Sequence, residues 1–190
     1  MLILASTSRY RADLLNRLGL PFDTRDPQTD EPELPLEPPA ARACRLALEK
    51  AEAVVTSSAQ GVIIGSDQVA AVAGQLLHKP GTMSNAIEQL RQMSGQQVVF
   101  HTAVAVVDTR DGSRQQAMDI TTATLRELND AEIERYLQAD QPLDCAGSFK
   151  VELLGISLFE SVSTDDPTAL VGLPLIKLCQ MLRQCGLSLP

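Results

Sequence analysis

Residues 61–80, GVIIGSDQVAAVAGQLLHKP, decide how the rest of the chain is organised. The apolar run 62–64 stops at Gly65, which is the pattern of a short buried strand and its end. Asp67 follows two residues later, and a second apolar run with its own glycine turn leads back to Lys79. Strand ends are where α/β folds present functional groups. We therefore expect Asp67 at the mouth of a sheet, with Lys79 returned toward it by a hairpin.

The composition is that of an acidic globular protein. The 190 residues are 44% hydrophobic and 21% charged, which favours one folded domain spanning residues 1–190. A net charge of −8 and only 3% aromatic residues disfavour binding to nucleic acid or to an anionic membrane. The four cysteines show no metal-site or CxxC spacing, and no apolar run is long enough to cross a bilayer. These features predict a soluble protein of the cytoplasm.

The first twenty residues have the pattern of a strand, a polar turn and a helix. Residues 2–5 are apolar, and a helix with inward-facing leucines follows Ser6 and Ser8. Arg11 falls in the first turn of that helix. Hydroxyls, a cation and the backbone N–H groups of a helix N-terminus together suit a phosphate-sized anion. Ser6 and Ser8 suit a purely capping role equally well, and the local sequence leaves both readings open.

Apolar periodicity predicts alternating strands and helices along the remaining chain. Strands are expected at residues 21–25, 96–108 and 114–125, and helices at 40–57, 82–93, 131–139 and 171–182. In residues 142–160 a glycine turn leads into an expected strand that carries Lys150 and Glu152 on one face. The pattern indicates an α/β fold with a mixed sheet flanked by helices.

Two further charged residues complete a set suited to phosphate chemistry. Glu31 lies in a proline-rich loop, and Lys50 lies on the expected helix 40–57. Cations offset phosphate charge, whereas Glu31 and Asp67 could hold a divalent ion and one carboxylate could activate water. Each charge, taken alone, also fits a solvated surface. The chain has no Walker loop, GxGxxG motif or GxSxG elbow, so water attack on a metal-bound nucleotide phosphate is the simplest chemistry.

Seven segments occur in a characteristic order from the first strand to the last helix. They are LILASTSRYRADLL, TDE, RLALEKA, IIGSDQV, HKP, CAGSFKVE and LVGLPL. Together they resemble the Maf family of nucleoside triphosphate pyrophosphatases over essentially the whole chain. The resemblance implies a Maf/ITPase-like fold with two lobes around a central cleft. It also implies hydrolysis of a nucleoside triphosphate to the monophosphate and diphosphate, with Mg²⁺ or Mn²⁺, by a cytoplasmic protein that could form a homodimer.

The resemblance assigns roles to the residues already singled out. It implies that Asp67 is the proton acceptor and, with Glu31, a metal ligand. The phosphate-binding residues that it implies are Ser6, Ser8, Arg11, Lys50 and Lys79. Two positions depart from the family pattern, because Arg9 replaces a proline and His78 replaces a glycine. Neither departure removes a catalytic group.

Three positions point to the family branch that acts on 7-methyl-GTP. They are Tyr10, Gln68 and Glu152. N7-methylated guanine is cationic, so the face of Tyr10 would attract it, and a carboxylate at Glu152 could accept both base N–H groups. Tyr10 stands where this branch is expected to have a tryptophan. The alternatives are the same reaction on dTTP, UTP or another modified nucleotide, or a non-catalytic nucleotide-binding regulator of cell division.

Overall fold

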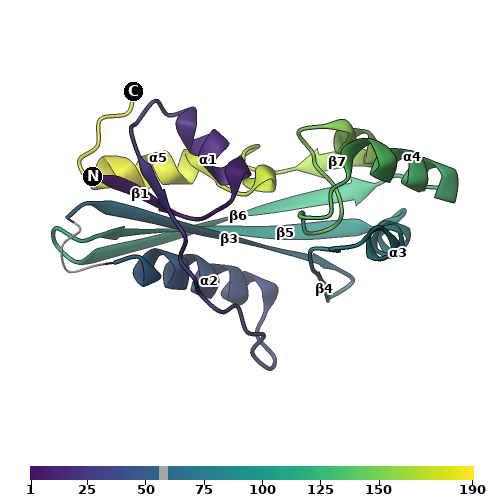
Figure 1. Ribbon diagram of the computed structural model, residues 1–190, viewed down its shortest axis with the longest axis horizontal. Coiled ribbons are helices and arrows are strands. Elements are labelled where there is room, and N and C mark those ends of the chain that lie inside the picture. The colour runs from purple at the N-terminus through teal and green to yellow at the C-terminus, as the bar shows by residue number, and fades with distance from the viewer. Residues whose placement is uncertain (56–59) are drawn as a thin grey trace. The chain divides into compact units, whose positions relative to one another are not determined.

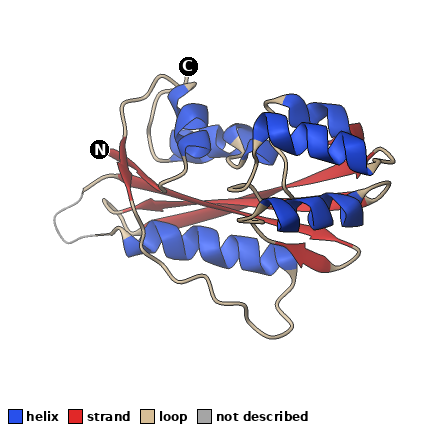
Figure 2. Cartoon of the chain, turned by 45° about the vertical axis from the view of Figure 1, so that its right-hand side comes forward, coloured by secondary structure: helices blue, strands red, loops and turns tan. Residues whose placement is uncertain are grey.

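The computed structural model describes residues 1–55 and 60–190. Its strands are β1 (Leu2–Ala5), β2 (Asp23–Arg25), β3 (Val62–Val72), β4 (Gln75–Leu77), β5 (Gln97–Asp108), β6 (Ser113–Leu125) and β7 (Phe159–Ser163). Its helices are α1 (Arg9–Asn16), α2 (Pro39–Ala53), α3 (Met83–Met93), α4 (Asp130–Asp140) and α5 (Leu175–Gln184), with the short 3-10 helices η1 (Leu154–Leu158) and η2 (Ala169–Val171). The strands join in the order β2-β1-β3-β5-β6-β7, with β4 paired to β3 (Figure 1). The expected α/β fold, a mixed sheet flanked by helices, is confirmed (Figure 2).

The chain divides into two compact units, and three strands contribute residues to both. Unit 1 contains residues 1–68, 101–119 and 166–190, and unit 2 contains residues 69–100 and 120–165. The strands β3, β5 and β6 each pass from one unit into the other. No helix in the described ranges is both long and apolar enough to span a membrane.

In unit 1, the strand β1 runs parallel to β2 and to β3. β1 lies between β2 and β3, with Ile3 opposite Asp23 on one side and Ile63 on the other. Helices α1 and α5 cover one face of these strands and α2 covers the other (Figure 1). Leu4 and Leu178 are fully buried in the apolar core on the α1 and α5 side. Burial on both faces explains why β1 and the first part of β3 are continuous apolar runs in the sequence.

Unit 2 is built on antiparallel pairs. β4 returns along the end of β3, with Ala70 opposite Leu77, so the predicted hairpin is confirmed. β7 pairs with β6, and α3 packs against α4. Phe149 packs edge-to-face on Phe100 and on Phe159, at ring-centroid distances of 5.5 and 4.8 Å. Such pairs add to the stabilisation that burial alone provides.

Polar caps fix the starts of three helices where the sequence predicts them. The side chains of Ser8, Thr82 and Asn129 accept bonds from backbone N–H groups in the first turns of α1, α3 and α4. Asn129 forms a reciprocal capping box with Glu132. The helix expected at residues 40–57 ends at Ala53, and its last two expected residues lie outside the described residues.

Two of the sequence predictions are wrong. Asp67 does not follow a strand end, because β3 continues through Gly65 and Asp67 to Val72. Lys150 and Glu152 do not share a strand face, because residues 151–153 form a turn before η1 and the strand β7 begins only at Phe159. Lys150 is buried and Glu152 is exposed.

Candidate active site

A glycine on β3 determines where α2 lies. A Cβ atom on Gly65 would stand 2.1 Å from the carbonyl oxygen of Ala47 and 2.7 Å from the backbone nitrogen of Ala51, both on α2. No other residue fits there, so the glycine serves close helix–strand packing rather than a turn. Asp67 follows Gly65 by two positions and therefore points to the same face of the strand. The carboxylate thus meets the helix that carries Lys50.

Lys50 and Asp67 form a buried ion pair. The Nζ atom of Lys50 lies 2.6 Å from Oδ1 of Asp67, and the two residues are only 7% and 5% exposed. Charges are seldom buried unless they are paired, because water solvates each of them strongly. The ammonium group therefore compensates the burial of the carboxylate, and the pair holds Asp67 in one place on β3.

Glu31 reaches the same ammonium group from the proline-rich loop. Its Oε1 atom lies 2.6 Å from Nζ of Lys50, and its side chain is 49% exposed. Arg42 on α2 holds the backbone beneath it, donating to the carbonyl oxygens of Glu31 and Pro32, both at 2.9 Å. Two carboxylates therefore converge on one lysine, one from a buried strand and one from a clamped loop.

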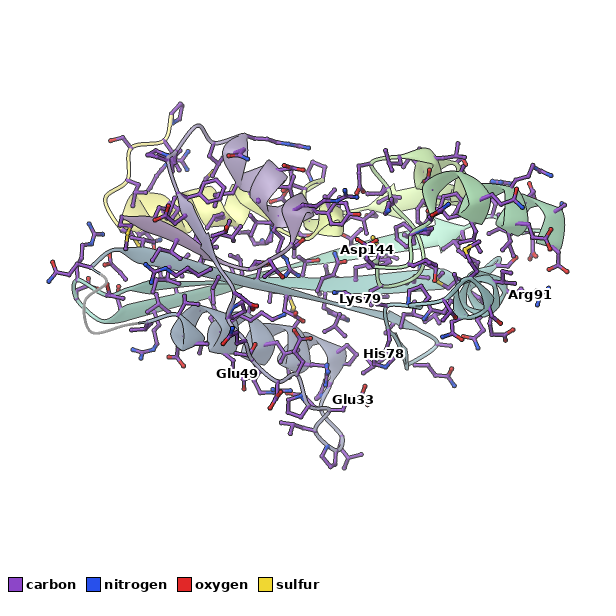
Figure 3. The ribbon with its side chains drawn as sticks, viewed as in Figure 1. Glu33, Glu49, His78, Lys79, Arg91 and Asp144 are labelled. Atoms are coloured by element: carbon purple, nitrogen blue, oxygen red, sulfur yellow. The ribbon has the colours of Figure 1, made fainter. Side chains whose placement is uncertain are left out.

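The same loop is fixed a second time by Arg45. Its guanidinium donates to both carboxylate oxygens of Glu37 at 2.7 Å. It also donates to Glu49, which lies one turn further along α2 and is labelled in Figure 3. The hydrogen bond from Arg45 holds the pKa of Glu37 below its usual value. Bidentate pairing of this kind is more directional than an ordinary surface ion pair. The loop that carries Glu31 is thus tied to α2 at two arginines.

The N-terminus of α1 gathers the predicted hydroxyls and cation. Ser8 Oγ accepts from the backbone N–H of Arg11, and Ser6 Oγ accepts from the backbone N–H of Ser8 at 3.1 Å and from Arg11 Nη1 at 3.5 Å. Burial lowers the pKa of the Arg11 guanidinium, whereas the negative charges of Asp67 and Glu31 act in the opposite direction. Ser8 is therefore a helix cap, and the N-terminus presents a cation under the electrostatic influence of both carboxylates.

A glycine after η2 supports Arg11. The carbonyl oxygen of Gly172 accepts from Arg11 Nε at 3.0 Å and from Ser66 Oγ at 3.0 Å. Gly172 has a φ of 124°, which favours glycine strongly. The roles of Arg42, Ser66 and Gly172 were not predicted from the sequence. Arg42 carried a detectable signal, because it precedes Lys50 by eight positions and so lies on the same helix face.

The two expected base-selecting residues of unit 1 are already engaged with their neighbours. The Nε2 atom of Gln68 donates to Thr102 Oγ1 at 3.0 Å and to the carbonyl oxygens of residues 169 and 170 at 3.0 and 3.1 Å. The guanidinium of Arg9 lies 4.8 Å from the ring centre of Tyr10 and donates to its hydroxyl at 3.0 Å. The amide nitrogen of Gln68 therefore holds η2 in place by hydrogen bonds. The ring of Tyr10 already contacts a cation, the guanidinium of Arg9.

Lys79 and Glu152 belong to unit 2. Both are exposed, Lys79 two residues after the hairpin strand β4 and Glu152 in the turn before η1. The backbone N–H of Gly81 donates to the carbonyl oxygen of Leu143 at 3.1 Å, which brings the Lys79 segment beside the loop after α4. Figure 3 shows Lys79 and Asp144 in this region.

The carboxylates of unit 1 fit a divalent cation. Glu31 Oε1 and Asp67 Oδ1 converge on one point of positive charge, the ammonium of Lys50. In the described part of the chain, no cluster of three or more His, Cys, Asp or Glu side chains forms a complete metal cage. Mg²⁺ is typically held by one or two carboxylates together with substrate phosphates and water, so two oxygen-donor residues suit it.

The chain is similar to known proteins over nearly its whole length. The model of the family described as "Maf-like protein" matches residues 1–185. The chain belongs to the Maf family. Maf relatives named "7-methyl-GTP pyrophosphatase" include proteins of Xanthomonas campestris pv. campestris (strain 8004) and Aromatoleum aromaticum. Each is 56% identical over 189 residues, covering 100% of this chain and 98% and 97% of the relatives. A Polaromonas protein of the same name is 55% identical over 188 residues, which cover 99% of this chain and 86% of the relative.

Proposed function

We propose that this Maf protein hydrolyses 7-methyl-GTP to 7-methyl-GMP and diphosphate. The observation that carries the proposal is the buried carboxylate of Asp67, held by Lys50 at 2.6 Å beside a second carboxylate and near Arg11. The substrate class is supported by relatives at 55–56% identity over nearly the whole chain. Because β3, β5 and β6 each continue from one unit into the other, we propose that residues 1–190 act as one domain.

The reaction requires a base and a group of cations. Asp67 accepts a proton from water, the water oxygen bonds to the α-phosphorus, and the bond to the bridging oxygen of the β-phosphate breaks to release diphosphate. Arg11, Lys50 and Lys79 offset the negative charge that develops on the phosphate oxygens. Glu31 and Asp67 would hold Mg²⁺ or Mn²⁺, which when bound would supply Lewis-acid polarisation of the phosphate.

Selection of a methylated base rests on its positive charge. The Tyr10 ring accepts a cation in the structure, the guanidinium of Arg9, and cationic 7-methylguanine would replace that guanidinium on the ring with a cation–π attraction of about 0.5–2 kcal/mol. The exposed carboxylate of Glu152 accepts the N1–H and N2–H groups of the base. Gln68 contributes through its Oε1 atom, since its Nε2 atom is bonded to η2 and Thr102.

The test of the reaction is a product assay on the full chain with Mg²⁺ or Mn²⁺ and 7-methyl-GTP, GTP, dTTP and UTP. We expect diphosphate from 7-methyl-GTP, and we expect Asp67→Asn to lower kcat by about 10²- to 10⁴-fold. Release of orthophosphate alone would refute the reaction type. Tight nucleotide binding without turnover would favour the non-catalytic regulator instead.

The test of base selection compares kcat/KM between methylated and unmethylated substrates. Tyr10→Ala and Glu152→Gln should each lower the preference for 7-methyl-GTP over GTP. Glu160→Gln serves as a matched control, because it removes another exposed carboxylate of unit 2. A wild-type preference for dTTP or UTP would contradict the proposed substrate while leaving the reaction intact.

A further inference from the structure

Two amide side chains of α3 hold the segment that carries Lys79. Asn85 Nδ2 donates to the carbonyl oxygen of Pro80 at 2.8 Å, and Gln89 Nε2 donates to the carbonyl oxygen of His78 at 2.9 Å. Asn85 and Gln89 are four positions apart and therefore lie on the same face of the helix. The two carbonyl groups flank Lys79 on either side. The backbone of this exposed lysine is consequently fixed from both directions.

Gln89 also bonds a second loop. Its Oε1 atom accepts from Ser148 Oγ at 2.6 Å. Ser148 is fully buried and has a φ of 59°, and it follows Gly147, whose φ is 79°. A left-handed conformation is unfavourable for serine and persists only where the surroundings impose it. The bond to Gln89 is one of the contacts that hold Ser148 in this turn.

The loop that begins at Ser148 leads directly to Glu152 and is anchored at two more points. The buried Lys150 donates its backbone N–H to Tyr136 Oη at 2.9 Å and its Nζ to the carbonyl oxygen of Asp140 at 3.1 Å. Past Glu152, the backbone N–H of Gly155 donates to Asp140 Oδ2 at 3.1 Å. Glu152 therefore stands on a short turn that is tied to α4 on both sides, at Lys150 and Gly155, and the loop that leads to it is tied to α3 at Ser148.

We propose that Gln89 is a positioning residue that links the segment carrying Lys79 to the loop carrying Glu152. The inference rests on the proposed function, in which Lys79 binds phosphate and Glu152 binds the base. The side-chain amide of Gln89 donates to the segment that carries Lys79 and accepts from the loop that carries Glu152. A shift of either the segment or the loop therefore breaks a hydrogen bond of Gln89. Asn85 holds only the lysine segment, and Ser148 belongs only to the base-selecting loop.

Steady-state kinetics of diphosphate release from 7-methyl-GTP and GTP separate these roles. Asn85→Ala should raise KM for both nucleotides alike, by about three- to ten-fold, because it frees only the Lys79 segment. Ser148→Ala should lower the ratio of kcat/KM for 7-methyl-GTP over GTP by a similar factor. Gln89→Leu should do both. The conservative variant Gln89→Glu keeps the acceptor for Ser148 and loses the donor to His78, so it should raise KM and retain the ratio.

A double variant provides the decisive comparison. If Ser148 acts on selectivity through Gln89, then Ser148→Ala combined with Gln89→Leu should lower the ratio no further than Gln89→Leu alone. Additive losses in the double variant would overturn the proposal. So would a Gln89→Leu enzyme with unchanged KM and unchanged ratio, or one that loses kcat/KM on both nucleotides by one common factor. Thermal melting of each variant shows whether a loss reflects unfolding.

Amide hydrogen exchange tests the link without reference to catalysis. Gln89→Leu should speed exchange in residues 78–81 and also in residues 148–155, whereas Asn85→Ala should speed it in residues 78–81 alone. Faster exchange in only one segment of the Gln89→Leu protein would refute the link. If the wild-type protein releases no diphosphate from either nucleotide, the proposed function fails, and the exchange result still decides whether Gln89 joins the two loops.

Discussion

Replacing Lys50 by methionine should destabilise the protein strongly. Methionine keeps most of the length and apolar volume of the lysine stem but removes the ammonium that bonds Asp67 and Glu31. Asp67 is only 5% exposed, so in the variant its carboxylate should stay buried without the cation that compensates its burial. Glu31 is half exposed and can turn toward water, so most of the loss comes from Asp67.

The size of the effect follows from the geometry of the pair. Two unit charges 2.6 Å apart attract each other by about 6 kcal/mol at an effective dielectric constant of about 20. The energy required to bury the ammonium offsets part of this attraction in the native protein. Removing one partner of a buried pair typically lowers the free energy of unfolding by about 3–5 kcal/mol. For a chain of this length, that corresponds to a fall in Tm of about 6–20 °C.

Urea denaturation followed by far-ultraviolet circular dichroism measures this loss. Lys79→Met is the matched control, because it removes the ammonium of an exposed lysine and should change stability by less than about 0.5 kcal/mol while still impairing turnover. The double variant Lys50→Met/Asp67→Asn removes both charges and should recover part of the stability that Lys50→Met loses. A loss below about 1 kcal/mol in Lys50→Met, or no recovery in the double variant, would refute the account of the pair.

Two further predictions concern positions outside this pair. Gly172→Ala should lower the free energy of unfolding by about 1–3 kcal/mol, because alanine is strained at a φ of 124°. It should also raise KM for the nucleotide, because the Gly172 carbonyl holds Arg11. An unchanged urea midpoint and an unchanged KM would contradict this prediction. Hydrogen bonds from Arg110 lower the pKa of Asp108 in the folded protein. This carboxyl therefore stabilises the fold at pH values above its unfolded pKa of about 4, and the stabilisation is lost as pH falls through its lower pKa in the folded protein. Arg110→Leu should therefore lower the free energy of unfolding at pH 7. The deficit should shrink between about pH 5 and pH 3 in urea titrations, and one that persists in acid would show that charge pairing is not its source.

The sequence predicted local structure well wherever a single residue determines it. Ser8 begins α1 because its side-chain oxygen accepts from a backbone N–H group that has no partner within the helix, a signal confined to four residues. The hairpin into β4 was likewise visible, because its turn at Gly74 requires a positive φ. The resemblance to the Maf family, which the family comparison confirms, then gave the candidate site residues together.

The position of Asp67 in its strand could not be predicted from such signals. A glycine after an apolar run fits a strand end and also fits a strand crossed closely by a helix, and the two patterns are identical in sequence. Only the distance from Gly65 to Ala47 and Ala51 on α2 distinguishes them. The turn after Lys150 could not be predicted either, because its conformation depends on bonds from Lys150 to Tyr136 and Asp140, which lie on α4.

The candidate catalytic residues and the candidate base-selecting residues differ in how deeply the fold buries them, and this difference affects how easily base preference could change. Asp67 and Lys50 are buried on a strand and a helix, so substituting either one disrupts the fold as well as the reaction. Tyr10 is half-buried on the first turn of α1, and Glu152 is exposed on a turn, where substitutions typically change stability by less than about 0.5 kcal/mol. Under the proposed function, base preference can therefore change by single substitutions at Tyr10 or Glu152 while Asp67 stays in place. This requires that the bonds from Ser148 to Gln89 and from Lys150 to Asp140 are kept.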